Sequence, residues 1–273
     1  MAVWSGGIYK EESGGKMRRL DSFFAELKAK RERKRQEAVA FPLPVPPLLL
    51  VPGTGGTADR FDKLIRLLKK QRPDLSVLKI TVNVDHQLRI SGRLFASSRF
   101  PVVVIAFADA SEAALLQQAD WLRTALMFLE EYYQVAEYDY FGHSNSGLVI
   151  TEYLENQRLS IDPRLQRLLL TGTPFGGAAD ANDKSIPQYL SSYRDKCHRI
   201  PEEIAVTLIA GNLQDSFSDG IVPVNSVATG LQIYKDTRSS RLITVTEGAA
   251  HSQLVTHPIV IELLLGEFGP KTE

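Results

Sequence analysis

Cysteine is nearly absent from this chain of 273 residues, and neither sign of charge is in excess. The one cysteine, Cys197, excludes a disulfide within the chain and a zinc site built on cysteines. Lys and Arg number 32, and Asp and Glu also number 32, so the formal net charge is zero. Such a chain has no general attraction for nucleic acid, for a membrane surface or for a highly charged substrate. We therefore expect no nucleic-acid partner.

Long apolar runs are also missing. No stretch approaches the roughly 20 apolar residues that a bilayer-spanning helix needs. Prolines interrupt the apolar tract from Phe41 to Gly53. The first residues show no basic segment followed by an apolar one, as a secretory signal would. We therefore expect a cytoplasmic protein without stable membrane insertion, and its oligomeric state stays open.

Residues 1–40 differ from the rest of the chain because charged residues crowd into them. Apolar residues recur at helical spacing between Leu20 and Leu27, which favours a short amphipathic helix. Its basic end could bind an anionic surface or a partner, or it could simply be solvated. Interspersed glutamates favour the second interpretation. We expect a charged N-terminal arm that is partly helical or poorly ordered.

Residues 41–273 alternate between short apolar runs and helical patterns, which is typical of an α/β domain with a mostly parallel sheet. The segment 176–201 is polar and interrupts this alternation between two predicted strands. Because ligands bind at the carboxyl ends of such strands, the segment is a candidate lid. The predicted strands are 47–53, 75–84, 88–95, 101–108, one that ends at 142, 165–172, 203–211 and 241–248. The predicted helices are 58–70, 111–134, one that ends near 156, and 257–267.

The stretch GHSNSG at 142–147 places Ser144 between a predicted strand and a predicted helix. It comes close to Gly-x-Ser-x-Gly, the sequence of a sharp turn that exposes a catalytic serine, but Ser146 stands in place of the second glycine. A serine nucleophile needs a neighbouring base, usually a histidine that a carboxylate orients. The same residues would also cap a helix well, so the stretch alone does not decide between the two roles.

Candidates for the acid and the base follow Ser144 in the chain order that this architecture requires. Asp219 lies in the loop 212–223 after one predicted strand, and His251 follows the last strand. Asp215 competes with Asp219, which we favour because a glycine and a proline close behind it give a fixed turn. Each residue could singly be ordinary turn or surface. Their order, each after a strand, favours a catalytic set of serine, aspartate and histidine.

An oxyanion hole needs backbone N–H donors that are already in position. In this architecture one donor is the residue after the nucleophile, here Asn145, and another lies in the loop after an early strand, here Thr54 or Gly53. We expect three further side chains to line the substrate pocket: His143, Tyr189 and Tyr193.

The same loop allows a second interpretation. Gly53, Gly55 and Ala58 fit the dinucleotide fingerprint G-x-G-x-x-A after a strand and before a helix. The partner acid should close the next strand about 20 residues on. Asp74 has that distance but precedes the strand, whereas Asp85 follows the strand but is too far away. A phosphate-binding P-loop is excluded because no Gly-Lys-Ser/Thr follows.

Together these stretches resemble the α/β-hydrolase superfamily, and more narrowly the DUF915 group of bacterial hydrolases, often labelled cell-surface hydrolases. The resemblance covers about residues 45–268 and rests on LLLVPGTGGTADRF, FGHSNSG, LLLTGTPFGG, SDGIVPVNS and AAHSQL. It implies an α/β-hydrolase fold in which Ser144 is the nucleophile, Asp219 the acid and His251 the base.

The chain departs from that group at two places near the site. Pro52 stands where relatives usually carry a histidine, and Ser146 replaces a glycine that is kept small because strand and helix pack closely there. Serine is small, so we expect the turn to survive. Many relatives also carry a membrane anchor or signal, and this sequence shows neither, so a surface location is not carried over.

We predict a serine hydrolase that acts on small or medium acyl esters through an acyl-enzyme. Its partner would be a small-molecule ester, and it would need no metal and no organic cofactor. Two other classes stay open. One is a non-catalytic α/β-hydrolase scaffold that binds a partner, and the other is a nucleotide-dependent oxidoreductase.

Overall fold

The computed structural model describes residues 41–177 and 188–268, whose strands and helices follow the predicted alternation. The strands are β1 (Leu48–Val51), β2 (Leu75–Val82), β3 (Leu88–Arg93), β4 (Phe100–Phe107), β5 (Glu137–His143), β6 (Arg164–Thr171), β7 (Ala205–Gly211) and β8 (Ser239–Val245). The helices are α2 (Asp62–Gln71), α3 (Leu115–Tyr133), α4 (Ser146–Glu152), α5 (Gln188–Lys196), α6 (Val224–Ala228), α7 (Gly230–Ile233) and α8 (Pro258–Gly266). A π-helical turn, Tyr153–Gln157, continues α4.

The described strands form one eight-stranded sheet in the order β3-β2-β4-β1-β5-β6-β7-β8. β3 is antiparallel to β2, and the other neighbouring strands are parallel. The predicted, mostly parallel sheet is therefore confirmed. β1 and β5 lie side by side in its middle, so the loops that follow them emerge together at the carboxyl end of the sheet.

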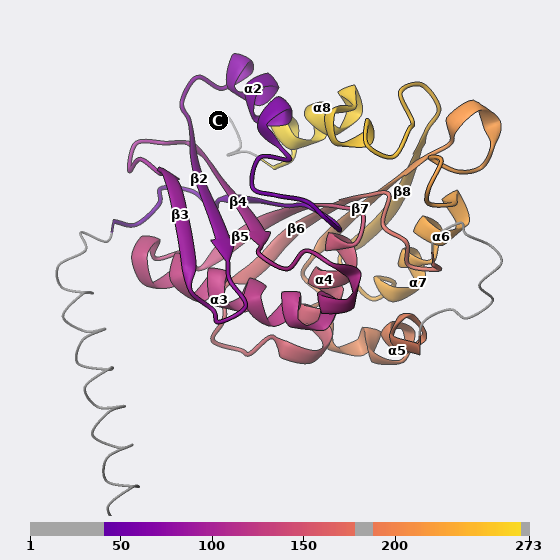
Figure 1. The fold of residues 1–273 in the computed structure, drawn as a ribbon, viewed down its shortest axis with the longest axis horizontal. Coiled ribbons are helices and arrows are strands. Elements are labelled where there is room, and N and C mark those ends of the chain that lie inside the picture. The colour runs from indigo at the N-terminus through magenta and orange to yellow at the C-terminus, as the bar shows by residue number, and fades with distance from the viewer. Residues whose placement is uncertain (1–40, 178–187, 269–273) are drawn as a thin grey trace, which may run out of the picture. The chain divides into compact units, whose positions relative to one another are not determined.

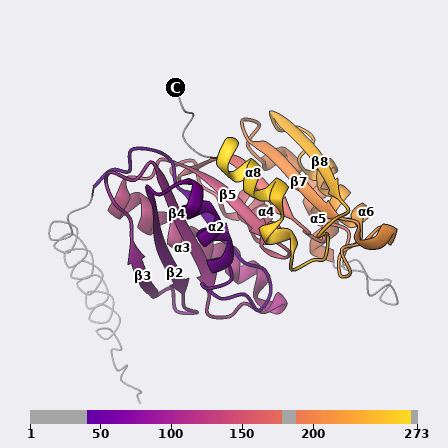
Figure 2. The same cartoon turned by 90° about the horizontal axis from the view of Figure 1, so that it is seen from above.

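Helices cover both faces of this sheet (Figure 1). α2 and α8 lie side by side on one face, as the view from above also shows (Figure 2). The helices α3 to α7 belong to the other face, where they share a hydrophobic core with the sheet. Sequential β–α units thus bury the strands on both sides, which is the arrangement that parallel strands require.

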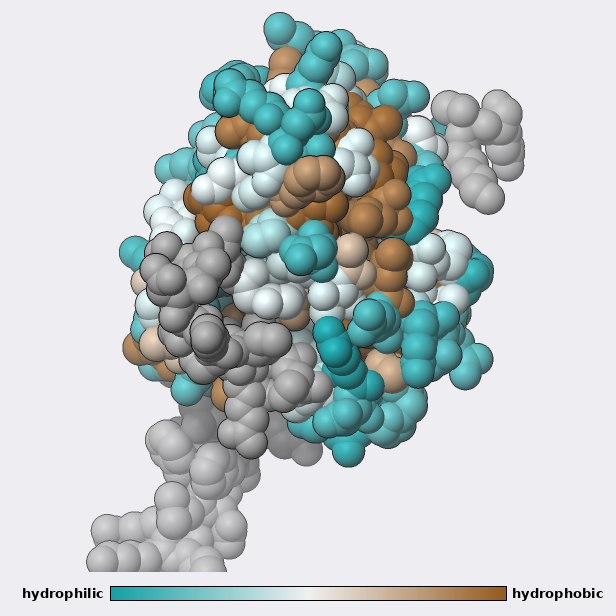
Figure 3. Space-filling view, turned by 90° about the vertical axis from the view of Figure 1, so that its right-hand side faces the viewer, coloured by the Kyte–Doolittle hydropathy of each residue, from teal (hydrophilic) through white to brown (hydrophobic). Residues whose placement is uncertain are grey.

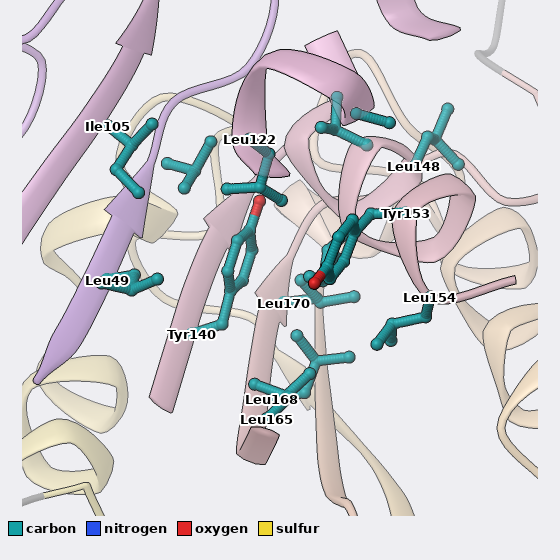
Figure 4. Close-up of a cluster of buried hydrophobic side chains, with 14 of the residues drawn as sticks. Leu49, Ile105, Leu122, Tyr140, Leu148, Tyr153, Leu154, Leu165, Leu168 and Leu170 are labelled. Atoms are coloured by element: carbon teal, nitrogen blue, oxygen red, sulfur yellow. The ribbon is translucent and has the colours of Figure 1, made fainter. Parts of the chain in front are cut away.

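The two cores explain why β4 reads as a continuous apolar run. All eight of its residues are buried, and successive side chains point to opposite faces. Val103 and Ile105 pack in the core beneath α3 and α4, whereas Val102 and Val104 pack in the core beneath α2 and α8. Figure 4 shows part of the first core, in which Tyr140 points from β5 toward the helices.

β8 is the last strand of the sheet, so one side of the molecule ends in a strand edge. Figure 3 looks onto this side and shows hydrophobic residues gathered across its middle, between hydrophilic ones. The loop after β7 adds two exposed apolar side chains, since Phe217 is 73% exposed and Ile221 is 53% exposed. The side that carries this loop therefore exposes apolar surface.

The loop between β1 and α2 is longer than we predicted, because the helix expected from Ala58 begins at Asp62. Two turns occupy the difference. The N–H of Arg60 donates to the carbonyl of Thr57 (3.0 Å), and the N–H of Asp62 donates to the carbonyl of Asp59 (3.1 Å). The chain uses these turns to pass over the carboxyl end of the sheet before the helix starts.

Part of the candidate lid, residues 178–187, lies outside the described residues. Its second half contains α5, which the sequence analysis did not predict. There Tyr193, Cys197 and Ile200 are buried, and Tyr193 and Ile200 join the core beneath α3 and α4. This half is anchored in the helical layer, and a lid stays a prediction for the rest.

A buried acid in the π-helical turn that follows α4 should make stability depend on pH. Glu155 is 3% exposed, and neither carboxylate oxygen has a hydrogen-bond partner among the described residues. Burial and the charge of Glu152 raise the pKa of Glu155 from 4.5 to about 8, although Lys196 and Arg199 act in the opposite direction. The folded protein therefore keeps a proton that the unfolded chain releases, so stability falls as pH rises toward 8.

We expect Glu155→Gln to remove that fall, because glutamine is uncharged at every pH. The free energy of unfolding of the wild type should drop by about 2–4 kcal/mol more than that of the variant between about pH 5 and pH 8. Urea denaturation at a series of pH values measures the difference. Glu203→Gln, the same change at an exposed position, is the control. Equal pH dependence in wild type and Glu155→Gln would contradict the prediction.

Candidate active site

Ser144 lies in the sharp turn between β5 and α4 with a φ of +59°, a left-handed conformation that residues other than glycine rarely adopt. Its N–H donates to the carbonyl of Thr171 at the end of β6 (2.9 Å), which fixes the turn to the neighbouring strand. Ser146 is fully buried, and its hydroxyl donates to the carbonyl of His143 (2.9 Å). The turn thus forms with serine in place of the expected glycine, as its small size predicts.

Asp219 and His251 form a hydrogen-bonded pair. Asp219 Oδ2 lies 2.6 Å from His251 Nδ1, and the backbone N–H of His251 donates to the backbone carbonyl of Asp219 (2.9 Å). Asp219 Oδ1 accepts the backbone N–H groups of Ile221 (2.9 Å) and Val222 (2.7 Å). The Asp219 side chain is fully buried, whereas that of His251 is 11% exposed. A carboxylate held in this way fixes the imidazole with Nδ1 as donor, which leaves Nε2 free to accept a proton.

The competing acid, Asp215, is exposed and sits in a strained turn with a φ of +57°. The structure pairs His251 with Asp219 instead, the aspartate that we favoured from its fixed turn.

Gly172, at the end of β6, provides the space for this pair. It has a φ of +57°, and a Cβ built there would lie 2.9 Å from both Asp219 Oδ2 and His251 Nδ1. A side chain at this position would therefore displace one of the two hydrogen-bonded groups.

For the ester hydrolysis predicted from the sequence, we expect Gly172→Ala to lower kcat/KM by about 100-fold, because small displacements of aligned catalytic groups cost that much. Steady-state hydrolysis of a chromogenic ester measures the effect. Gly248→Ala is the control, since Gly248 has a similar φ of +62° but its Cβ would meet nothing closer than 3.5 Å. Equal activity losses in the two variants would mean that backbone strain, not crowding of the pair, is responsible.

The loop after β1 lies against the Ser144 turn. A Cβ at Gly53 would come within 2.7 Å of the His143 carbonyl oxygen and of Ser144 Cβ, so only glycine allows this approach. The side-chain amide of Asn145 donates to Thr54 Oγ1 (2.7 Å), which links the loop to the turn. Within 41–177 and 188–268, the backbone N–H groups of Gly53, Thr54 and Asn145 have no acceptor. The structure thus brings the predicted oxyanion donors together with their N–H groups unused.

A cavity of about 290 Å³ opens at this place. It is lined by Gly53, Thr54, Gly55, Gly56, Arg60, His143, Ser144 and His251. The ring of His143 packs on that of His251, with centroids 4.5 Å apart. Burial, with added repulsion from His251 and Arg60, lowers the pKa of His143 well below its usual value. His143 is therefore a neutral part of the wall at neutral pH.

The other two predicted pocket residues are not found in this wall. Tyr193 is fully buried in the core beneath α3 and α4. The side chain of Tyr189 lies outside the described residues. The polar composition of the segment predicts a loop, but its second half joins the core through a few apolar positions.

Arg60 lines the cavity, although the sequence analysis did not single it out. A lone arginine in a turn, with aspartates at positions 59 and 62, gives the pattern of an ordinary surface ion pair. Only the position of the turn over the carboxyl end of the sheet makes this arginine a candidate.

The dinucleotide interpretation of the same loop does not fit its course. α2 begins four residues beyond Ala58, so the glycines do not lead directly into a helix N-terminus that could hold a pyrophosphate. Asp74 precedes β2 and pairs with Arg72, away from the strand's carboxyl end.

Within residues 41–177 and 188–268, no group of three or more His, Cys, Asp or Glu side chains could hold a metal ion. None of the helices found there is both long and apolar enough to cross a membrane.

The fold and the arrangement around Ser144 define an α/β hydrolase. The chain belongs to the DUF915 family, described as alpha/beta hydrolases of unknown function, whose model matches residues 42–268. The resemblance inferred from the sequence is therefore confirmed, and so is the predicted α/β-hydrolase fold. No functionally curated protein matches the chain.

Solved structures of similar proteins come from several bacteria. A protein from Lactobacillus plantarum WCFS1, proposed to be a cell surface hydrolase, is 30% identical, with a TM-score of 0.70 over 82% of this chain and 91% of that one. The lin2722 product of Listeria innocua is 26% identical, with a TM-score of 0.72 over 84% and 96%. The carboxylesterase CesB of Bacillus subtilis, 10% identical with a TM-score of 0.50 over 83% and 84%, is similar in fold alone.

Proposed function

We propose that this protein is a serine hydrolase that cleaves small or medium carboxylic esters, with Ser144 as nucleophile, His251 as base and Asp219 as the acid that orients it. The observation that supports this most is the 2.6 Å contact between Asp219 and His251 beside a cavity that Ser144 and His251 both line. A histidine oriented by a carboxylate, next to a serine held in a strained turn, is the arrangement that activates a hydroxyl for attack.

In the proposed acylation step, Ser144 Oγ attacks the ester carbonyl carbon while its proton passes to His251 Nε2. The negative charge that forms on the carbonyl oxygen would be stabilised by the N–H groups of Asn145 and Thr54, or of Gly53 in place of Thr54. Collapse of the tetrahedral intermediate breaks the bond to the alcohol oxygen, which leaves with the proton from Nε2. The acyl group stays on Ser144 as an ester.

Deacylation repeats the same steps with water. His251 Nε2 takes a proton from water as the water oxygen attacks the acyl carbon, and the Ser144 oxygen then leaves and recovers that proton. The products are a carboxylic acid and an alcohol. Asp219 keeps its charge throughout and stabilises the imidazolium that forms in each half of the cycle.

The size of the substrate is proposed from the cavity. Its wall consists of backbone from the glycine-rich loop and of polar side chains, and it encloses about 290 Å³. Such a cavity offers little apolar surface to a long acyl chain, which supports small or medium acyl groups.

A fluorophosphonate probe tests the proposal, because it phosphonylates an activated serine much faster than an ordinary one. We expect the probe to label the wild type and mass spectrometry to find the adduct on the peptide that contains Ser144. An adduct on another residue would contradict the assignment of the nucleophile. No labelling, together with no turnover of any ester in a panel of graded chain length, would favour the non-catalytic scaffold instead.

A further inference from the structure

The cavity wall contains one permanently charged side chain. Of the described residues that line the cavity, Arg60 alone has a side chain that stays charged at every ordinary pH, and the others are glycines, hydroxyl residues and two histidines. Its charge reaches the cavity, since it is among the causes that lower the pKa of the buried His143. Arg60 is exposed, and it lines the same cavity as Ser144 and His251.

The acids next to Arg60 in the sequence do not neutralise it. Asp59 and Asp62 both bind Lys79, whose Nζ lies 2.6 Å from one carboxylate oxygen of each. Among the residues that the structure describes, no carboxylate forms an ion pair or hydrogen bond with Arg60. The two acids next to Arg60 in the sequence are thus paired with Lys79. The five N–H donors of Arg60 stay available to a ligand.

The rest of the wall does not compete for an anion. His143 is 4% exposed, and the carboxylate of Asp219 is buried behind His251 and occupied by it. An incoming anion would meet no negative charge in the wall and one planar guanidinium, which suits a carboxylate in a bidentate contact. The zero net charge of the chain does not oppose this, because a single local charge provides the attraction.

We infer that Arg60 binds a carboxylate on the substrate, so that the preferred esters carry a second, negatively charged group a few atoms from the bond that breaks. This deepens the proposed function and rests on it. Arg60 is then a specificity-determining residue, and the natural substrate is a half-ester of a short dicarboxylic acid or an acyl ester of a short hydroxy acid.

Two pairs of esters with similar shapes test whether the carboxylate lies on the acyl side or on the alcohol side of the substrate. Monoethyl succinate and ethyl 4-methylpentanoate differ on the acyl side by a carboxylate in place of an isopropyl group. Acetoxyacetate and isobutyl acetate differ in the same way on the alcohol side. Acid release in a pH-stat, with Ser144→Ala as background, gives kcat/KM for each ester.

We expect the wild type to prefer the anionic ester by about tenfold in one pair, and Arg60→Gln to remove that preference while changing the neutral ester less than about threefold. Arg60→Lys should retain part of the preference, because lysine keeps the positive charge but cannot make the bidentate contact of a guanidinium. Arg66→Gln, at an exposed position of α2, is the control and should leave both ratios unchanged. Ratios that Arg60→Gln does not change in either pair would overturn the inference.

Binding without reaction separates this inference from the proposed function. In the Ser144→Ala variant, titration with monoethyl succinate should shift the amide NMR signals of residues 53–56, and Arg60→Gln in that background should weaken binding about tenfold. If the fluorophosphonate probe does not label the wild type and no ester is hydrolysed, but this difference in binding is found, the proposed function fails and the role of Arg60 in binding a carboxylate stands. If turnover is found but neither the ester ratios nor binding depend on Arg60, the hydrolase stands and this inference fails.

Discussion

Replacement of Ser144 by alanine should lower the rate of ester hydrolysis by about 10⁴-fold or more. The remaining rate would come from substrate binding and the backbone N–H donors alone. The proposed reaction has no other nucleophile, since the hydroxyl of Ser146 is buried and bound to the His143 carbonyl. Alanine adopts the left-handed φ of this position about as poorly as serine does, and the N–H that donates to Thr171 is kept. The loss would therefore report on chemistry and not on unfolding.

Steady-state kinetics on a chromogenic ester, with thermal denaturation of the same preparation, measures both properties. Ser146→Ala is the matched control, two residues away in the same turn. It should cost about 1–2 kcal/mol of stability, because it leaves a buried carbonyl without its donor, and it should retain most of the activity. If Ser146→Ala were the inactive variant and Ser144→Ala the active one, the nucleophile would be assigned wrongly.

Replacement of Asp219 by asparagine should lower kcat by about 10³- to 10⁴-fold. The side-chain oxygen would still accept the N–H groups of Ile221 and Val222, which leaves the amide NH₂ facing His251 Nδ1. A donor at that place forces Nδ1 to accept and so puts the proton on Nε2. The imidazole could then no longer take the proton of the Ser144 hydroxyl.

Kinetics with saturating ester distinguish this loss of kcat from a change in KM. The change in KM should be small, because Asp219 does not line the cavity. Asp215→Asn, the same change four residues away at an exposed position, should retain full activity. Comparable losses in the two variants would point to a general role of the loop, and a larger loss in Asp215→Asn would restore the rejected acid.

Much of this fold was open to prediction, because its signals are local. The continuous apolar run that became β4 and the glycine-rich ends of β1 and β5 each show their role within a few residues. The order of Ser144, Asp219 and His251 along the chain added a long-range constraint, since each follows a strand whose carboxyl end meets the others. Chain order pointed to Ser144, to His251 and to the loop that carries the acid, and the fixed turn at Asp219 then favoured it over Asp215.

What the sequence did not reveal depends on tertiary contacts. Tyr193 is predicted as a pocket residue but packs in the hydrophobic core, and no local pattern distinguishes these two positions of a tyrosine. Arg60 carries no sequence signal of a site residue, because its two acidic neighbours give the pattern of an ion pair. Only the structure shows that Lys79, about 20 residues further along the chain, pairs with both acids, so that neither pairs with Arg60.

The glycine at the end of β6 has a consequence for comparing relatives. Gly172 satisfies two separate demands, a left-handed backbone and an empty space beside the Asp219–His251 pair, and no other residue meets both. A descendant that lost the reaction but kept the fold for binding would be released from the second demand and could tolerate alanine or asparagine there. Under the proposed mechanism, glycine at this position should therefore mark the relatives that hydrolyse esters, even among relatives that all keep the serine, the aspartate and the histidine.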